Sequence, residues 1–183
     1  MLRGDLTGLR ARHEDDVPVL QSELYDDVDT QSRASSRPWR PVVPGSSASP
    51  YAPTDATADM ALFSVVRLAD GELVGSATLW GIDPHNRLAH LGISLRPAHR
   101  GRGLAVDIVR VLCRYGFSTL GLRRLQAETL ADNTAMIRAA LRVGFIQEGT
   151  LRCSAWVSGQ FVDEVILGLL DTEWALPRTA TAS

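Results

Sequence analysis

The sequence predicts a mixed α/β fold built as a single domain. The chain has 183 residues, close to the usual size of one domain, and 45% of them are hydrophobic, which suffices for a substantial core. Alternating apolar and polar residues, typical of half-buried strands, occupy much of the second half of the chain. Two stretches with helical spacing lie among these strands, so we expect hairpins at the front and back and two central helices.

The N-terminal part is expected to form a strand followed by a helix. Residues 6–12 alternate and predict a short first strand, and residues 13–29 predict a helix with three acidic residues in its first turn. The apolar stripe of this helix repeats at helical spacing and comprises Val17, Leu20, Leu24 and Val28. The opposite face bears only acidic charges, namely Glu23, Asp26, Asp27 and Asp29. This face is either a solvated surface or a feature that attracts a cationic substrate.

Residues 30–59 have the composition of a long loop. They hold five of the nine prolines, six serines and only scattered apolar residues such as Trp39. Loops of this length in a compact domain are commonly binding loops or disordered segments. We therefore expect either a lid over the substrate or plain disorder.

The remaining elements are read from alternation and turn residues. Asp70-Gly71 predicts a hairpin turn, Asp132 or Asn133 predicts a helix start, and Gly144 predicts the end of that helix. The expected strands are 61–68, 73–80, 87–95, 125–130, 145–150, 151–157 and 162–169, and the long central helix is 104–120.

Composition excludes several kinds of chemistry. The net charge is −2, so no positive field draws in nucleic acid or an anionic membrane. All 19 basic residues are arginines, which excludes P-loop nucleotide hydrolysis, Schiff-base chemistry and Ser-Lys hydrolysis. His85, His90 and His99 lack the spacing of metal ligands, so we expect no metal site.

The two cysteines and the N-terminal residues indicate in which cellular compartment the protein is expected. The start, Met-Leu-Arg-Gly-Asp, has no apolar signal core, and no stretch approaches the roughly 18 apolar residues of a membrane span. We therefore expect a cytoplasmic, reducing environment. Cys113 and Cys153 are expected to be ordinary buried thiols.

The most unusual segment is Arg100-Gly101-Arg102-Gly103-Leu104-Ala105, between a strand and the long helix. Its glycines allow a tight turn with exposed amides, and the helix N-terminus adds partial positive charge. Together with Arg100 and Arg102 these features fit a pyrophosphate cradle that uses no lysine. The dinucleotide fingerprint would require glycine where Val106 stands. A glycine turn with solvated arginines is the plainer alternative.

Several motifs together resemble one family. Arg100-x-x-Gly103-x-Ala105 is similar to the acyl-CoA motif Arg/Gln-x-x-Gly-x-Gly/Ala of the GNAT superfamily of N-acetyltransferases. Ala131-Asp132-Asn133-Thr134, the Gly144-Phe145 segment and the tail from Leu151 to Trp174 resemble the branch that acetylates ribosomal-protein N-termini, which is RimJ/RimL-like. The resemblance extends over residues 9–174 and is weakest in the Pro/Ser loop.

The resemblance implies a GNAT fold of the α/β (α+β) class. In this fold a twisted, mixed, mostly antiparallel sheet is splayed between its fourth and fifth strands, here residues 88–95 and 125–130, and helices cover both faces. The implied co-substrate is acetyl-CoA, held in the resulting cleft. The implied domain is a single unit over residues 1–176, with a flexible tail over 177–183.

The resemblance also suggests which residues bind the cofactor. Backbone groups of Ile93 and Leu95 would pair with the pantetheine arm as an extra strand would. Asn133 would contact the cofactor from the next helix, with a plain helix cap as the alternative. The pyrophosphate would be held by Arg100, Gly101, Arg102, Gly103, Leu104 and Ala105.

The catalytic groups are less well defined. Family members often carry Tyr or Ser at the positions of Ala140 and Met136, and neither residue present can protonate a leaving thiolate. The general acid is therefore unassigned, or the thiolate leaves into solvent. His90 is the favoured base and Glu128 the second candidate, because an attacking amine must lose a proton. The alternative for His90 is a hydrogen-bonded histidine within the sheet. The alternative for Glu128 is a charged side chain that faces solvent.

The function that follows is N-acetylation by direct attack of a primary amine on acetyl-CoA in a ternary complex. A peptide or protein N-terminus is the favoured acceptor, and a polyamine or aminoglycoside is the first alternative. A second class is a non-catalytic module that binds acyl-CoA as a sensor. A third is a protein with an anion-binding loop and no CoA affinity. A homodimer is compatible with Trp156 or Trp174 packing against a partner.

Overall fold

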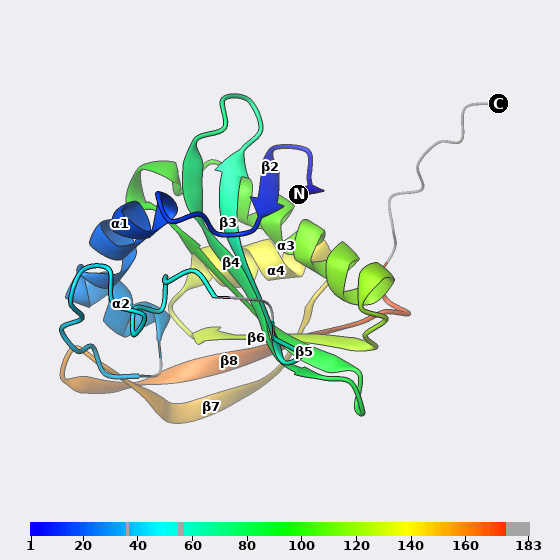
Figure 1. Cartoon of the computed structure of the whole chain (residues 1–183). Coiled ribbons are helices and arrows are strands. Elements are labelled where there is room, and N and C mark those ends of the chain that lie inside the picture. Colours follow the sequence, from blue (N-terminus) through cyan, green and yellow to red (C-terminus); the bar gives the residue numbers. More distant parts are fainter. Residues whose placement is uncertain (36, 55–56, 175–183) are drawn as a thin grey trace.

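The protein is built around an eight-stranded sheet, as seen in a computed structural model that describes residues 1–35, 37–54 and 57–174 (Figure 1). The strand order is β1-β2-β3-β4-β5-β6-β8-β7, and every neighbouring pair is antiparallel except β5 and β6. The strands are β1 (Leu2–Arg3), β2 (Thr7–Arg10), β3 (Met60–Arg67), β4 (Leu73–Asp83), β5 (Leu88–Leu95), β6 (Arg124–Leu130), β7 (Ile146–Val157) and β8 (Gln160–Leu170). This confirms the predicted mixed, mostly antiparallel sheet.

Helices cover both faces of the sheet. On one face α3 (Leu104–Arg114), continued by the π-helix η3 (Tyr115–Thr119), and α4 (Thr134–Val143) pack over the large core. On the other face α1 (Asp16–Leu20), the π-helix η1 (Gln21–Tyr25) and α2 (Val28–Ala34) lie over a smaller cluster (Figure 1). A short 3₁₀ turn, η2 (Pro97–His99), precedes α3. None of the helices in the described ranges is long and apolar enough to cross a bilayer.

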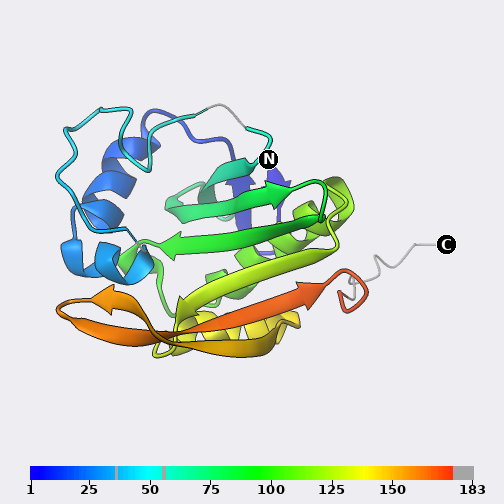
Figure 2. The same ribbon diagram turned by 90° about the horizontal axis from the view of Figure 1, so that it is seen from below.

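The sheet is splayed between β5 and β6, as the family resemblance implied. These parallel strands pair only through Leu88↔Arg124, Ala89↔Leu125 and His90↔Gln126. Beyond His90 the two strands separate, and Figure 2 shows the gap between them widening. These are the fourth and fifth strands of the sequence prediction. Their labels are higher by one because the structure has an additional strand, β1, before the expected first strand.

The predicted helix over residues 13–29 is broken in the structure. It ends in η1, and Asp27 then caps α2 by accepting a hydrogen bond from the Thr30 amide at 3.2 Å. Asp27 has an extended backbone, so the apolar stripe stops before Val28, whose exposed fraction is 46%. A side chain that competes for backbone hydrogen bonds favours a helix start over a helix interior, which explains the break.

The predicted loop over residues 30–59 begins five residues too early, because α2 continues to Ala34. The rest of its described residues form no helix or strand, as expected, but they bury side chains. Tyr51 packs with Leu20, Leu24 and Tyr25, and Trp39 and Val42 border this cluster. The Trp39 indole also donates a hydrogen bond to the Tyr25 carbonyl at 3.0 Å. The described part of this segment therefore covers the first helices.

The C-terminal strands differ from the prediction in one respect. Residues 145–150 and 151–157 form a single long strand, β7, whose pairing with β8 is shifted at two irregular points. Cys153 lies at one of them with a φ of 51° and is exposed, so the prediction that both thiols are buried is wrong for it. Trp156 is 62% exposed, whereas Trp174 packs against the core. The predicted tail over 177–183 lies outside the described residues.

Candidate active site

The open side of β5 lies in the splay. In the antiparallel β4–β5 ladder, the Arg96 amide donates to the Val74 carbonyl at 3.0 Å, which makes Gly75↔Leu95 a non-hydrogen-bonded pair. Because this pattern alternates along a strand, Ile93 and Leu95 direct their backbone N–H and C=O groups away from β4, toward the side where β6 has separated. These are the backbone groups expected to pair with a pantetheine arm.

The glycine-rich turn lies at the N-terminus of α3. Gly101 and Gly103 have φ values of 74° and 79°, a left-handed conformation that favours glycine, and no atom lies within 4 Å of the position of an added Cβ. Gly103 stands at the N-cap position, so no side chain caps the first-turn amides of α3. Uncapped amides beside open space fit an anionic group such as a pyrophosphate.

The other predicted cofactor residues differ in exposure and in hydrogen bonding. Arg102 is exposed. Arg100 is also exposed, and its Nε donates to the Leu95 carbonyl at 3.0 Å, which holds this side chain at the end of β5. Leu104 is buried and Ala105 is half-buried in the first turn of α3. Asn133 caps α4 by accepting from the Met136 amide at 3.2 Å, and its Nδ2 donates to Thr129 at 2.9 Å. Asn133 therefore acts as a helix cap in this structure.

The two candidate bases lie side by side where the splay begins. His90 belongs to the last residue pair between β5 and β6, and its Nδ1 is 3.5 Å from Oε1 of Glu128. That distance is longer than an ordinary hydrogen bond, and Nδ1 of His90 is buried without a hydrogen-bond partner among the described residues. Both side chains are partly accessible, with exposed fractions of 21% for His90 and 34% for Glu128. The structure thus brings together two residues that the sequence separates by almost forty positions.

Four further residues, which the sequence did not indicate, contact this pair or one another. The Trp80 ring stacks on the His90 ring with centroids 4.2 Å apart. Gln126 donates to Glu128 at 2.7 Å and accepts from Arg124 at 2.9 Å, and Arg124 also pairs with Glu148. The result is a chain of hydrogen bonds along β6 that ends at Glu128, whose carboxylate lies 3.5 Å from Nδ1 of His90. Alternation along residues 124–128 is the one sequence signal that would have placed Arg124, Gln126 and Glu128 on one face.

The positions where the resembled family often has an acid carry no such group here. Ala140 is fully buried on α4, and Met136 packs against the core. The described residues also contain no group of three or more His, Cys, Asp or Glu side chains that could hold a metal ion.

The sequence model of the acetyltransferase (GNAT) domain family matches residues 7–146, more than half of the chain. The chain belongs to the GNAT acetyltransferase family. This match spans the splay, the glycine-rich turn and both candidate bases.

Individual relatives carry related names. The chain is 33% identical over 113 residues to an uncharacterized N-acetyltransferase, p20, from Bacillus licheniformis, covering 62% of this chain and 64% of the relative. It is 33% identical over 107 residues to a putative ribosomal N-acetyltransferase, YdaF, from Bacillus subtilis, covering 58% of each. The chain thus spans less than two thirds of the length of these curated relatives.

The fold also matches solved structures. A spermidine N-acetyltransferase from Vibrio cholerae, solved in complex with CoA and spermine, superimposes with a TM-score of 0.75 over 91% of this chain and 96% of that chain. Its sequence identity is 19%, so this likeness establishes the GNAT fold.

Proposed function

We propose that this protein is an acetyl-CoA-dependent N-acetyltransferase with its cofactor in the splay between β5 and β6. One observation carries the proposal: the β5 backbone that faces away from β4 connects the uncapped N-terminus of α3 to the His90–Glu128 pair. Acetyl-CoA has a pyrophosphate, a strand-like pantetheine arm and a reactive thioester in that order, which matches an anion cradle, an open strand edge and a base. Family membership supports the same assignment.

The geometry suggests how the chain would assist the reaction. Nδ1 of His90 faces Glu128, which leaves Nε2 to accept a proton from the attacking amine. The amine nitrogen then forms a bond to the acetyl carbon as the carbon–sulfur bond breaks. The leaving thiolate takes its proton from solvent, because neither Ala140 nor Met136 offers one. Trp80 and Glu128 are positioning residues that hold the imidazole plane.

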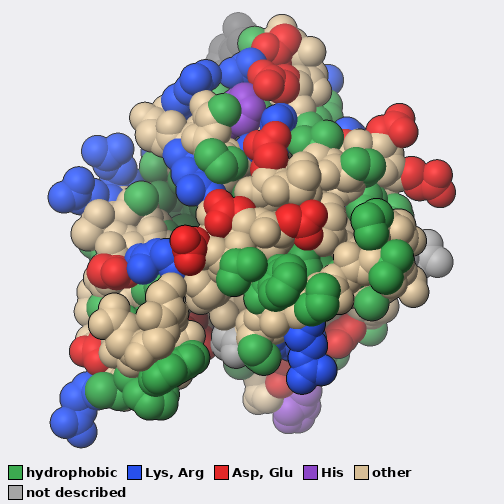
Figure 3. Space-filling model, turned by 90° about the vertical axis from the view of Figure 1, so that its left-hand side faces the viewer, with side chains coloured by type: hydrophobic (Ala, Val, Ile, Leu, Met, Phe, Trp, Pro, Cys, Tyr) green, Lys and Arg blue, Asp and Glu red, His purple; other side chains and the backbone are tan. Residues whose placement is uncertain are grey.

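For the acceptor we favour the amino terminus of a peptide or protein. A polyamine would need free carboxylates near the cleft, and several carboxylates of the acidic first helix are already engaged. Glu23 forms a two-bond ion pair with Arg96, at 2.5 and 3.0 Å, and Asp26 accepts from Gln21 at 2.8 Å. Figure 3 shows acidic and basic side chains next to one another on the side of the molecule that carries α1 and α2. The relative named as a putative ribosomal N-acetyltransferase agrees with this preference.

A thiol-release assay tests the acceptor. The full chain would be incubated with acetyl-CoA and either short peptides with free N-termini or spermidine, with N-terminally blocked peptides as the matched control. We expect thiol release with free peptides and none with blocked ones. Turnover with spermidine alone would contradict the peptide acceptor and favour a small amine, as in the named spermidine acetyltransferases. Tight acetyl-CoA binding without turnover on either panel would favour the sensor alternative.

A further inference from the structure

Three titratable side chains near the splay share one face of the sheet. The neighbours of His90 along β5 belong to the large core under α3 and α4, so His90 points to the opposite face. On β6, Glu128 alternates with the core residue Ala127 and points the same way as His90. On β8, Glu164 alternates with the core residue Val165 and also points to this face. An acceptor that reaches His90 therefore lies against this face.

Glu164 lies diagonally across from Glu128. In the β6–β8 ladder Glu128 pairs with Ile166, so Glu164 is two residues further along the neighbouring strand. Diagonal neighbours of this kind are about 7 to 8 Å apart. One residue of an extended peptide spans about 3.5 Å, so a group bound at Glu164 lies only one or two residues from an amine that reacts beside His90.

The Glu164 carboxylate is held in place and keeps one oxygen free. Ser154 donates to its Oε2 at 2.6 Å. Ser154 lies where the pairing of β7 with β8 is irregular, between Leu151 and Ala155, and such bulges re-aim side chains next to active sites. Glu164 is half-buried, and none of the described residues donates to its Oε1. The orientation of this free oxygen is therefore fixed before a ligand binds.

The arginines on neighbouring elements pair with other carboxylates. Arg33 on α2 pairs with Asp132 at 2.6 Å, and Arg124 on β6 pairs with Glu148. No basic side chain in the described part of the chain lies within ion-pair distance of Glu164. A fixed, half-buried carboxylate of this kind favours a cationic ligand, because a charge-assisted hydrogen bond is stronger than a neutral one.

We propose that Glu164 binds a lysine or arginine side chain at the second position of the acceptor peptide and so selects basic N-termini. This inference rests on the proposed transfer to peptide N-termini and names the acceptor class. A long basic side chain at that position spans the distance from the reacting amine to Glu164. One free oxygen fits one added cation, whereas spermidine carries two charged groups besides its reacting amine.

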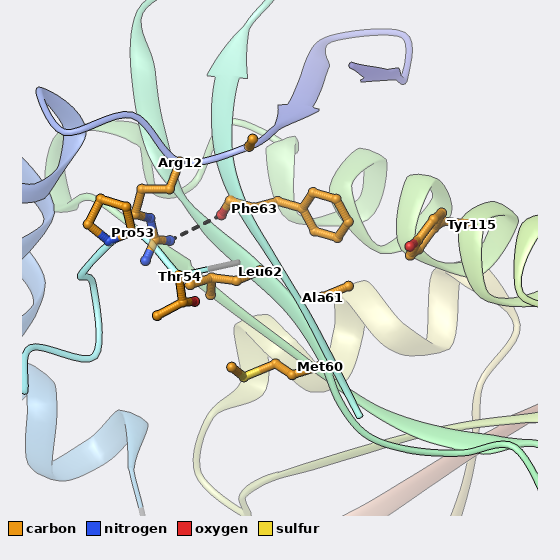
Figure 4. Close-up of a pocket in the computed structure, with 9 residues that line it drawn as sticks. Arg12, Pro53, Thr54, Met60, Ala61, Leu62, Phe63 and Tyr115 are labelled. Atoms are coloured by element: carbon orange, nitrogen blue, oxygen red, sulfur yellow. Dashed lines mark hydrogen bonds between the residues drawn. The ribbon is translucent and has the colours of Figure 1, made fainter. Parts of the chain in front are cut away.

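The pocket drawn in Figure 4 does not suit the same ligand. It has a volume of about 440 Å³ and lies along residues of β3, two strands away from β5. The described residues that line it include Arg12 and no carboxylate, so a basic side chain would find no ion pair there. The second charge of the acceptor is therefore expected at Glu164.

Steady-state kinetics with matched peptides tests the proposal. One peptide begins Ser-Arg and the other Ser-citrulline, which keeps the shape of arginine without its charge. We expect kcat/KM to be about tenfold higher for Ser-Arg, through a lower KM, because the ion pair is made equally in the ground state and the transition state. The advantage should shrink as the salt concentration rises. Equal kcat/KM for the two peptides would overturn the role of Glu164 and leave acetyl transfer to peptides intact.

Two variants locate the effect. Glu164→Gln keeps the size of the side chain and an oxygen that can accept from Ser154, and it should bring the two peptides to within about twofold of each other. Glu14→Gln removes the same charge from an exposed position just before α1 and should retain the preference for Ser-Arg. A preference that survives in folded Glu164→Gln would contradict the assignment.

Peptide binding separates this proposal from the proposed function. If neither peptide is acetylated, both would be titrated into the full chain in the presence of saturating CoA. Tighter binding of the Ser-Arg peptide, lost in Glu164→Gln, would support the role of Glu164 and contradict acetyl transfer to peptides. Equal binding of the two peptides, or no binding of either, would overturn the role of Glu164 as well.

Discussion

His90 is fixed by contacts from two neighbouring strands. Trp80 on β4 stacks on its ring, and Glu128 on β6 faces its Nδ1 at 3.5 Å. A base that must meet a substrate amine at one nitrogen benefits from having the other nitrogen and the ring plane held. The sheet places Trp80, His90 and Glu128 together at the point where β5 and β6 separate.

His90→Ala should lower kcat/KM by about a hundredfold to ten-thousandfold, the usual contribution of a positioned general base. Acetyl-CoA affinity should be unchanged, since the proposed cofactor contacts come from the β5 backbone and the α3 turn. Steady-state kinetics beside calorimetry measures both. His85→Ala is the matched control, because His85 lies exposed in the β4–β5 turn. An unaltered kcat/KM in His90→Ala would show that another group takes the proton.

The candidate site could be predicted from the sequence only in part. The parity of residues 88–95 correctly places His90 on the face opposite Leu91 and Ile93, because a strand alternates strictly. Contacts that join distant strands have no local pattern. Trp80 stacking on His90, and Arg12 reaching Ser76, depend on register between strands, which the sequence does not specify.

At the scale of elements, Asp16 connects α1 to β2. It accepts from the His13 amide at 2.8 Å and from Arg10 through both oxygens. Burial alone would raise the pKa of Asp16, but the hydrogen bonds from Arg10, the His13 amide and Ser64 outweigh burial and lower it to about 2. The ionised carboxylate is therefore part of what holds the first helix in place.

This shift predicts a pH dependence of stability. Because the pKa is lower in the folded state than the ordinary 3.8, ionised Asp16 stabilises the fold above about pH 4, and the gain is lost as the pH falls toward about 2. The contribution near neutral pH is roughly 2 kcal/mol. In urea unfolding at several pH values, Asp16→Asn should lose the stability at neutral pH and flatten the change between about pH 4 and pH 2.

Asp15→Asn is the control for this measurement, because Asp15 is the exposed neighbour at the start of the same helix. It should leave the pH profile of unfolding close to that of the wild type. Equal profiles for Asp16→Asn and the wild type would mean that the Asp16 contacts do not stabilise the fold.

Elements with a strong local signal were predicted best. The Asp70-Gly71 hairpin and the α4 cap and stop at Asn133 and Gly144 are confirmed, since each rests on turn or cap chemistry within a few residues. The predicted helix over 13–29 failed at Asp27, where capping competed with a continuing apolar stripe. The sequence pattern divides residues 145–157 into two strands, whereas the structure forms the single strand β7, whose pairing with β8 is irregular near Cys153.

At the scale of the whole molecule, the sheet consists of two halves joined weakly. The first half of the chain supplies β1 to β5, the second half supplies β6 to β8, and the halves pair through only three residue pairs. A ligand lying along the free edge of β5 would bridge them. Binding of such a ligand to the folded state alone would also raise stability in proportion to its concentration.

The most direct test of the cofactor assignment is calorimetric titration of acetyl-CoA into the wild type and Gly103→Glu. This substitution places a bulky anion at the uncapped N-terminus of α3. Gly159→Glu makes the same change at another left-handed glycine, φ 87°, in the β7–β8 turn, and controls for backbone strain and charge. We expect tight binding by the wild type and Gly159→Glu and none by folded Gly103→Glu. Failure of the folded wild type to bind, or equal binding by Gly103→Glu, would contradict it.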